Sequence, residues 1–183
     1  MKTGFFIDMR IRELMESSLY TIAVDLDGVL VDFMHTANKI SGMRMKEGEL
    51  DTLEKHEKDQ FWATIVDHIE GGNQFFGAMQ PMRDAMVLWN YVKRHPHFVL
   101  TAAGGRLASA AHEKRTWVKT HLGNKVKVEI VDKAADKARY ATPYTILIDD
   151  RPKSIDPFIA AGGIGILHTD AKSTIRQLKK LGL

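Results

Sequence analysis

The chain of 183 residues contains no cysteine. Disulfide bonds and thiolate metal sites are therefore excluded, and the composition suits a reducing compartment. No apolar run approaches the roughly 20 residues that a membrane-spanning helix requires. The first ten residues also lack the cationic start and long apolar core of a signal peptide. We therefore expect a soluble, cytoplasmic protein with no membrane partner.

Repeats, low-complexity tracts and a strong charge of either sign are absent as well. The net charge of +3 is compatible with anionic ligands but too weak to indicate nucleic-acid binding. The eight histidines show no convincing metal-ligand spacing. Gly104-Gly105 lacks the spacing of a dinucleotide fingerprint or a P-loop. What remains is an ordinary globular chain, long enough for one domain with a substantial core.

Apolar segments typical of strands alternate with segments at helical spacing, which predicts an α/β sandwich with a mostly parallel sheet. The expected strands are 20–24, 98–100, 126–131, 145–148 and 164–167. The polar, helix-prone segment between the first two strands is too long for a plain crossover. We interpret it as a small helical cap inserted at about residues 33–80. The single domain, 1–183, then has its core at about 18–32 and 81–183.

Two of the expected strands end in paired acids. Asp25 and Asp27 follow strand 20–24, and Asp149-Asp150 follow strand 145–148. Like charges placed this close repel and raise each other's pKa unless a cation or a proton intervenes. Because ligands bind beyond the carboxyl ends of parallel strands, we expect these carboxylates to meet there. Such a set suits a hard cation that prefers oxygen ligands, such as magnesium.

The same edge should carry groups that bind an anion. Thr101 ends strand 98–100, and the loop after strand 126–131 supplies Lys133 and Lys137. Acids for a cation, with a hydroxyl and an amine for an anion, fit a metal-bound phosphate. Either lysine is a plausible partner on position alone.

Each motif also has a simpler interpretation. Asp25-x-Asp27-Gly28 matches a calcium loop, but the following residues are apolar rather than further oxygen ligands. Asp149-Asp150-Arg151-Pro152 could be a solvated turn, since Asp and Pro are normal turn residues. Thr101 could be an ordinary strand residue and either lysine a solvated one. The combination of motifs favours the functional interpretation.

In chain order, Asp25-x-Asp27-Gly28-Val29, Thr101, a lysine and Asp149-Asp150 resemble the four motifs of haloacid dehalogenase-like phosphohydrolases. The resemblance covers about residues 20–170. Finer features resemble the branch of 5'-nucleotidases, deoxy (pyrimidine), cytosolic type C; they are Asp25 to Phe33, Phe75-Phe76, Met79-x-Pro81, Glu113-Lys114, Trp117-Val118, Asp136-Lys137 and Leu147 to Pro152. This resemblance implies a three-layer α/β/α Rossmann-like core with a helical C1-type cap after the first strand.

The resemblance also implies catalytic roles. Asp25 would be the nucleophile that forms an aspartyl-phosphate, and Asp27 would be the general acid and then the base. Thr101 would hold the phosphoryl oxygens and Lys137 would neutralise charge. Lys137 is favoured over Lys133 because Asp136-Lys137 matches the family's Asp-Lys pair.

The remaining implied roles concern the metal and the substrate. Asp25, the Asp27 carbonyl and Asp149 would ligate Mg²⁺, with Asp150 acting through water. The phosphate and the organic part of the substrate would meet the N–H groups of Ala102 and Ala103 and the side chains of Phe33, Phe75, Phe76 and Arg106. The aromatic residues could equally be core, and Arg106 could be solvated.

We therefore expect a Mg²⁺-dependent phosphomonoesterase acting on a (deoxy)nucleoside monophosphate. Alternatives are another small phosphate ester, a nucleic-acid 3'-phosphate, or a catalytically silent protein that binds a ligand. A nucleic acid is disfavoured because the cap segment 48–70 is rich in acids. The sequence does not indicate an oligomeric state.

Overall fold

The computed structural model describes residues 19–46, 48–104 and 107–183. Its centre is a five-stranded sheet with the order β3-β2-β1-β4-β5, in which every neighbouring pair is parallel. The strands are β1 (Thr21–Val24), β2 (His97–Ala102), β3 (Val128–Val131), β4 (Thr145–Asp149) and β5 (Ile164–Leu167). The predicted α/β class with a parallel sheet is confirmed.

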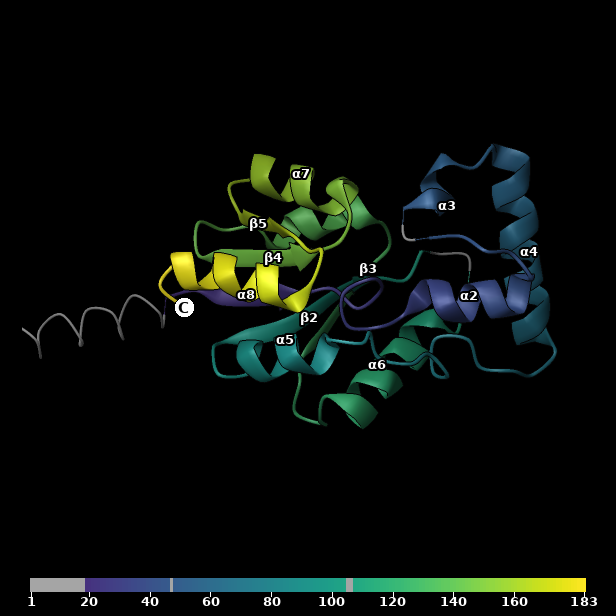
Figure 1. The fold of residues 1–183 in the computed structure, drawn as a ribbon, viewed down its shortest axis with the longest axis horizontal. Helices are drawn as coiled ribbons and strands as arrows, with labels where there is room; N and C mark the ends of the chain where they lie inside the picture. Colours follow the sequence, from purple (N-terminus) through teal and green to yellow (C-terminus); the bar gives the residue numbers. More distant parts are fainter. Residues whose placement is uncertain (1–18, 47, 105–106) are drawn as a thin grey trace, which may run out of the picture.

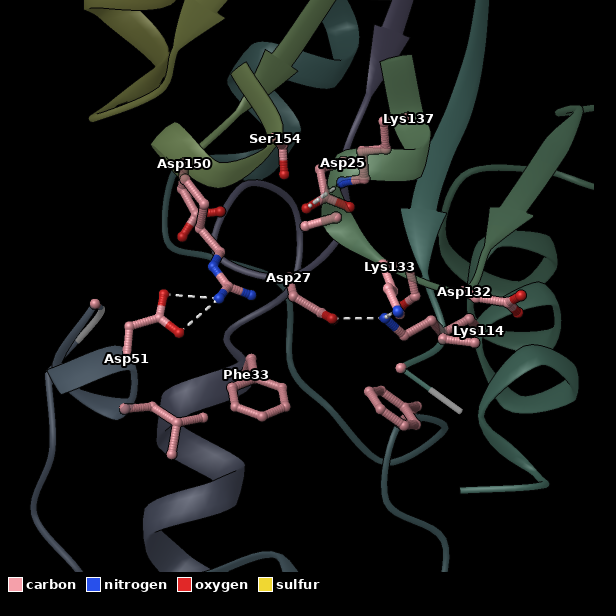
Figure 2. Close-up of a pocket in the computed structure, with 18 of the residues that line it drawn as sticks. Asp25, Asp27, Phe33, Asp51, Lys114, Asp132, Lys133, Lys137, Asp150 and Ser154 are labelled. Atoms are coloured by element: carbon pink, nitrogen blue, oxygen red, sulfur yellow. Dashed lines mark hydrogen bonds and ion pairs between the residues drawn. The ribbon is translucent and has the colours of Figure 1, made fainter. Parts of the chain in front are cut away.

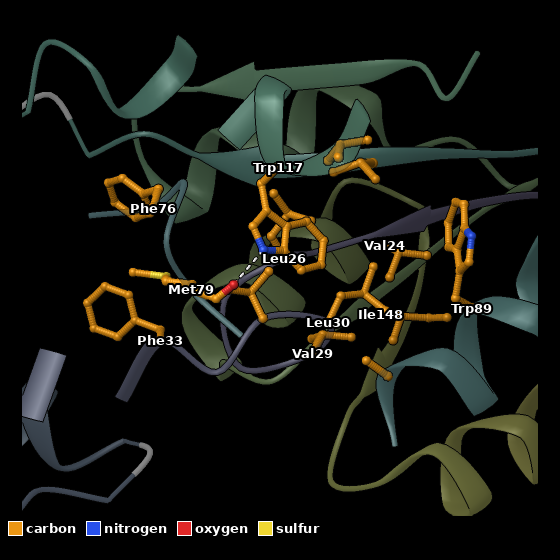
Figure 3. Close-up of a cluster of buried hydrophobic side chains, with 14 of the residues drawn as sticks. Val24, Leu26, Val29, Leu30, Phe33, Phe76, Met79, Trp89, Trp117 and Ile148 are labelled. Carbon is orange, nitrogen blue, oxygen red and sulfur yellow. Dashed lines mark hydrogen bonds between the residues drawn. The ribbon is translucent and has the colours of Figure 1, made fainter. Parts of the chain in front are cut away.

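The sheet has a helical layer on each face, because alternate residues of its strands point to opposite sides. Ile22 and Ile148 belong to one apolar cluster, and Ala23 and Leu147 belong to another. The first cluster includes residues of α5 (Ala85–Val92), α6 (Ala110–His121) and α8 (Ala171–Lys180). Figure 3 shows two of them, Trp89 of α5 and Trp117 of α6. The second includes residues of α7 (Pro152–Ala160), which packs against the 3₁₀ helix η1 (Ala134–Tyr140). The core is therefore a three-layer α/β/α sandwich.

Three helices lie between β1 and α5 in the sequence and stand apart from the sheet in space (Figure 1). They are α2 (Phe33–Ser41), α3 (Glu49–Thr52) and α4 (Lys55–Glu70). The Asp32 side chain caps α2 by accepting the His35 N–H at 2.9 Å, and Gly42, at φ 72°, ends the helix in the left-handed region. We call these three helices the cap, and they fall within the predicted insertion.

The chain does not enter a helix directly where it returns from the cap to the core. Pro81 instead forms an antiparallel bridge with Val31, and the Met82 N–H donates to the Leu30 carbonyl at 3.0 Å. Helix α5 consequently begins only at Ala85. These contacts join the two segments that connect the cap to the core. One of them, Leu30 and Val31, follows Asp27 within a few residues.

The described helices include none that is both long and apolar enough to span a lipid bilayer.

Candidate active site

The acidic side chains of two neighbouring strands meet at the carboxyl edge of the sheet. Val24 is paired in register with Ile148, so the residues that follow them, Asp25 and Asp149, are placed side by side. Carboxylate oxygens of Asp25, Asp149 and Asp150 lie within 4.8 Å of one another. The parallel pairing of β1 and β4 therefore assembles an acidic cluster from segments that are far apart in the sequence.

The donor set of this cluster fits a magnesium ion. It consists of carboxylate oxygens, which Mg²⁺ prefers. The Oδ1 atom of Asp25 is buried and has no hydrogen-bond partner among the residues that the structure describes. Gly28 leaves the space that Asp150 needs, since a Cβ atom at position 28 would lie 2.4 Å from Asp150 Oδ2. A buried carboxylate oxygen of this kind calls for a cation or another polar partner.

Lys137 forms ion pairs with two acids of the cluster, Asp25 and Asp149. Its side chain, from η1, is buried, and its Nζ lies 2.9 Å from Asp25 Oδ2 and 2.6 Å from Asp149 Oδ2. Lys133, the alternative, is exposed and lines the cavity above the cluster. The geometry therefore supports Lys137 as the amine that stands beside Asp25.

A second buried lysine, Lys114, was noted in the sequence only as part of a family motif. Its Nζ lies 2.5 Å from Asp27 Oδ2, 3.2 Å from Thr101 Oγ1 and 2.7 Å from the Ala102 carbonyl oxygen. Lys114 lies on α6 between Ala110 and Trp117, one turn from each, on the buried face of the helix. A lysine within such an apolar stripe was the available sequence signal.

The pKa values of the acids differ because their surroundings differ. Burial would raise the pKa of Asp25, but Lys137 and Lys114 outweigh burial and hold it below its ordinary value. Burial, reinforced by the charge of Asp25, raises the pKa of Asp27 despite Lys114. Burial and Asp25 likewise raise the pKa of Asp149 to about 6, against the effect of Lys137. Asp25 is thus favoured as a carboxylate, whereas Asp27 is better able to hold a proton.

The strand end at Thr101 is arranged differently from the expectation. Thr101 is fully buried, and the contact of its hydroxyl is with Lys114, so its contact with a phosphate stays a prediction. Ala102 and Ala103 line the cavity, but the Ala103 N–H donates to the Val131 carbonyl at 2.9 Å. The predicted phosphate contact through that N–H is therefore not available in this structure. Arg106 lies outside the described residues.

A cavity of about 320 Å³ opens above the acids. Its polar end includes Asp25, Asp27 and Lys114, and its other wall comes mainly from the cap (Figure 2). The large apolar side chains that line it are Phe33, Met34, Leu50, Trp62 and Phe76. One end of the cavity therefore suits a phosphate and a cation, and the other suits a flat apolar group.

The three predicted aromatic contacts separate into two groups. Phe33 and Phe76 line the cavity. Phe75 is fully buried and does not, because its ring packs edge-on against Phe33 at 5.7 Å and against Phe76 at 4.8 Å between centroids. This corrects the expectation that Phe75 contacts the substrate: consecutive side chains of the segment point in different directions, and Phe75 supports the other two rings.

The cap and the core are joined at the cavity by an ion pair that the sequence analysis missed. Both Oδ atoms of Asp51, on α3, accept hydrogen bonds from Arg151 Nη2 at 2.7 Å (Figure 2). Lys153 Nζ lies 3.0 Å from Asp51 Oδ1. The main-chain N–H of Arg151 donates to Asp149 Oδ1 at 3.0 Å. Arg151 thus contacts both the cap and the acidic cluster, although 100 residues separate it from Asp51.

Several solved structures have the same fold as this chain. A haloacid dehalogenase-like hydrolase from Xanthomonas campestris has a TM-score of 0.60 and 13% identity, over 90% of this chain and 92% of that one. A predicted phosphatase from Clostridium acetobutylicum has a TM-score of 0.55 and 13% identity, over 89% and 90%. A hydrolase from Streptococcus pneumoniae TIGR4 has a TM-score of 0.54 and 13% identity, over 89% and 99%. At these identities the likeness establishes the fold.

The family of this chain is shown by a match to its sequence. The model of the family "5' nucleotidase, deoxy (Pyrimidine), cytosolic type C protein" matches residues 19–177. The chain belongs to this family and is a phosphatase of the haloacid dehalogenase type, as its sequence motifs predict. A comparison with curated proteins finds no match.

Proposed function

We propose that this protein is a Mg²⁺-dependent phosphomonoesterase that hydrolyses nucleoside 5'-monophosphates, deoxynucleotides in particular, through an aspartyl-phosphate on Asp25. The observation that carries the proposal is the cavity, which has Asp25 and Asp27 at one end and the rings of Phe33 and Phe76 at the other. Family membership supports the same substrate class.

The chemistry divides into two balanced steps. First, an Asp25 carboxylate oxygen attacks the phosphorus, the ester P–O bond breaks, and Asp27 gives its proton to the departing oxygen. Then Asp27, now ionised, takes a proton from a water molecule, the water oxygen attacks the phosphorus, and Asp25 leaves as a carboxylate. The lowered pKa of Asp25 and the raised pKa of Asp27 fit these starting states.

The two buried lysines support different parts of this sequence. Lys137 stabilises the ionised Asp25 before attack, because its Nζ lies 2.9 Å from Asp25 Oδ2. Lys114 holds Asp27 over the substrate and compensates its charge after proton transfer, because its Nζ lies 2.5 Å from Asp27 Oδ2. Asp25, Asp149, Asp150 and the Asp27 carbonyl would hold magnesium, which would neutralise charge on the phosphoryl oxygens when bound.

The apolar end of the cavity supports a nucleobase as the organic group. The rings of Phe33, Trp62 and Phe76 surround this end, and aromatic faces pack well on a planar base. A sugar phosphate alone would leave these rings without a partner. A polynucleotide end is disfavoured because the Asp51–Arg151 ion pair and the cap stand over the cavity.

The experiment is phosphate release from a panel of ribonucleotides, deoxynucleotides, deoxyribose 5-phosphate and 3'-phosphorylated DNA, with and without Mg²⁺. The expected result is turnover of nucleoside monophosphates that a chelator abolishes and Mg²⁺ restores. Asp25→Asn should remove this turnover together with any trapped phosphoenzyme. Near-normal rates in Asp25→Asn would contradict the nucleophile, and preference for another ester would contradict the substrate. Ligand-induced stabilisation without turnover of any ester would indicate a binding protein.

A further inference from the structure

We propose that Glu113 is a positioning residue for substrate recognition, which fixes the segment 75–77 so that Phe76, rather than Phe75, forms the wall of the cavity. The proposal rests on the proposed function, because it names a residue that makes the enzyme prefer phosphate esters with a planar group. The acid cluster does not provide this role.

Glu113 is a buried carboxylate whose contacts are with the main chain of a distant segment. It lies on α6, 8% exposed, and its Oε2 accepts the N–H of Phe75 at 2.9 Å and the N–H of Gly77 at 3.0 Å. An ionised acceptor makes such hydrogen bonds shorter and stronger than a neutral one does. Two N–H groups on either side of Phe76 are thus held by one oxygen atom.

A second residue of the same helix holds the other end of this segment. The Trp117 indole Nε1 donates to the Met79 carbonyl oxygen at 2.8 Å (Figure 3). Glu113 and Trp117 are four residues apart and therefore lie on the same face of α6. The helix thereby fixes both ends of 75–79, and the segment has little freedom to rotate.

The neighbouring residue connects this support to the reacting end of the cavity. Lys114 Nζ lies 4.6 Å from the centroid of the Phe76 ring and also contacts Asp27. Helix α6 therefore sets the position of the aromatic wall through Glu113 and the position of the acid through Lys114. A shift of the wall relative to the acid would misplace a bound ester.

The choice between the two phenylalanines is the consequence that can be measured. In the present arrangement Phe75 is fully buried, and Phe76 lines the cavity. Glu113→Gln keeps the shape of the side chain but offers a neutral oxygen and adds two N–H groups that need acceptors. The segment should then be less firmly held, and the wall should be less well formed.

The test compares a deoxynucleoside 5'-monophosphate with deoxyribose 5-phosphate, which has the same phosphate end but no base. In Glu113→Gln, we expect kcat/KM for the nucleotide to fall by about tenfold, corresponding to roughly 1.4 kcal/mol. The loss should appear mainly in KM. The sugar phosphate should change by less than about twofold, because it does not use the aromatic wall. Equal losses on both substrates would overturn the proposal.

A double-mutant cycle identifies the residue through which Glu113 acts. Phe76→Leu should lower kcat/KM for the nucleotide by a similar factor. Adding Glu113→Gln to Phe76→Leu should then lower kcat/KM little further. Additive effects would show that Glu113 does not act through Phe76. Glu129→Gln, on β3, is the matched control, because its Oε2 accepts from Tyr140 at 2.9 Å outside the cavity. Glu129→Gln should leave kcat/KM unchanged for both substrates.

Two further outcomes are separable. If Glu113→Gln does not fold, Glu113→Asp keeps the charge but shortens the side chain, and it should show the same nucleotide-selective loss; an unselective loss would overturn the proposal. If the wild type does not hydrolyse nucleotides, the proposed function fails. The role of Glu113 is then decided in the same way with 4-nitrophenyl phosphate against glycerol 3-phosphate.

Discussion

Lys114 Nζ lies 2.5 Å from Asp27 Oδ2, and these two residues are separated by 87 positions in the sequence. Lys137 pairs instead with Asp25 and Asp149. Each acid of the Asp25-x-Asp27 motif therefore has its own buried lysine, supplied by a different element. The pKa values of the two acids differ because both lysines lower the pKa of Asp25, whereas burial and the charge of Asp25 outweigh Lys114 at Asp27.

Replacing Lys114 with methionine should change the pH dependence as well as the rate. Lys114 opposes the burial that raises the pKa of Asp27, so its removal should raise that pKa further. A general acid must be protonated to act, so the alkaline limb of the pH–rate profile should move to higher pH. We expect kcat to fall by about 10- to 100-fold, within the usual contribution of a positioned acid. Lys119→Met, on the exposed side of the same helix, is the control; an unmoved limb in Lys114→Met would contradict the pairing.

Gly28→Ala should disturb the acidic cluster through a steric contact. Gly28 has φ 74°, and an added Cβ atom would lie 2.4 Å from Asp150 Oδ2. Gly42 has φ 72° with nothing within 4 Å of an added Cβ, so Gly42→Ala incurs only the backbone cost of about 1 kcal/mol. Urea unfolding and Mg²⁺ titration of both variants separate the two effects. Equal behaviour would mean that Asp150 simply moves aside.

Magnesium should stabilise the folded protein, and the stabilisation should depend on Asp149. A ligand that binds only the native state adds about 2.7 kcal/mol when its concentration is 100 times its Kd. We expect Asp149→Asn to lose most of this gain in thermal or urea unfolding. Asp156→Asn, an exposed acid on α7, should keep it. A wild type that Mg²⁺ does not stabilise would exclude the metal from this site.

The affinity for Mg²⁺ should also rise with pH. The pKa of Asp149 is raised to about 6, and a carboxylate binds a metal only when it is ionised. Binding below this pH therefore requires the release of a proton. Titration calorimetry at about pH 5 and pH 7.5 should show weaker binding at the lower pH. An affinity that does not change between these values would contradict the raised pKa.

Asp51→Asn should loosen the cap at the mouth of the cavity. Although burial opposes it, the hydrogen bonds and charges of Lys153 and Arg151 lower the pKa of Asp51. A lowered pKa means that the stabilisation is present above the unfolded pKa, about 3.9, and is lost as the pH falls through the folded value. The difference in unfolding free energy between the wild type and Asp51→Asn should therefore be constant above about pH 5 and shrink below about pH 4.

Because Asp51 is partly exposed, that difference should be no more than about 1 kcal/mol. Turnover by Asp51→Asn should show a higher KM with kcat nearly unchanged, since Asp51 lies on the cap and does not contact the reacting atoms. Asp67→Asn, an exposed acid on the cap helix α4, should alter neither quantity. If the difference in unfolding free energy between the wild type and Asp51→Asn persists down to pH 3, the ion pair is not its source.

Much of the fold follows from local sequence patterns. The apolar strands, the helical segments between them and the long insertion after β1 predict the parallel sheet and the cap. The meeting of Asp25 with Asp149 follows as well, because both residues come directly after strands, and parallel strands share one carboxyl edge. Lys137 was distinguishable from Lys133 only through the family's Asp-Lys pair, and the structure supports that choice by its contacts.

The missed features all depend on where a helix face or a loop is directed. Lys114 could have been a solvated lysine, and its role depends on the face that α6 turns toward Thr101. Phe75 and Phe76 are adjacent and chemically identical, and only the packing around them decides which lines the cavity. The Ala103 N–H was expected at the phosphate, but pairing with Val131 takes it. Apart from the apolar stripe around Lys114, none of these contacts leaves a periodic signal.

The sequence by itself determined the layered α/β architecture and the gathering of acids at one sheet edge, because strand periodicity and strand ends are local properties. Only the tertiary structure decided which lysine stands beside which acid, which aromatic ring forms the wall, and that Arg151 reaches Asp51. These depend on side chains brought together across long separations, and their energies come from burial and close pairing, which exist only once the chain has packed.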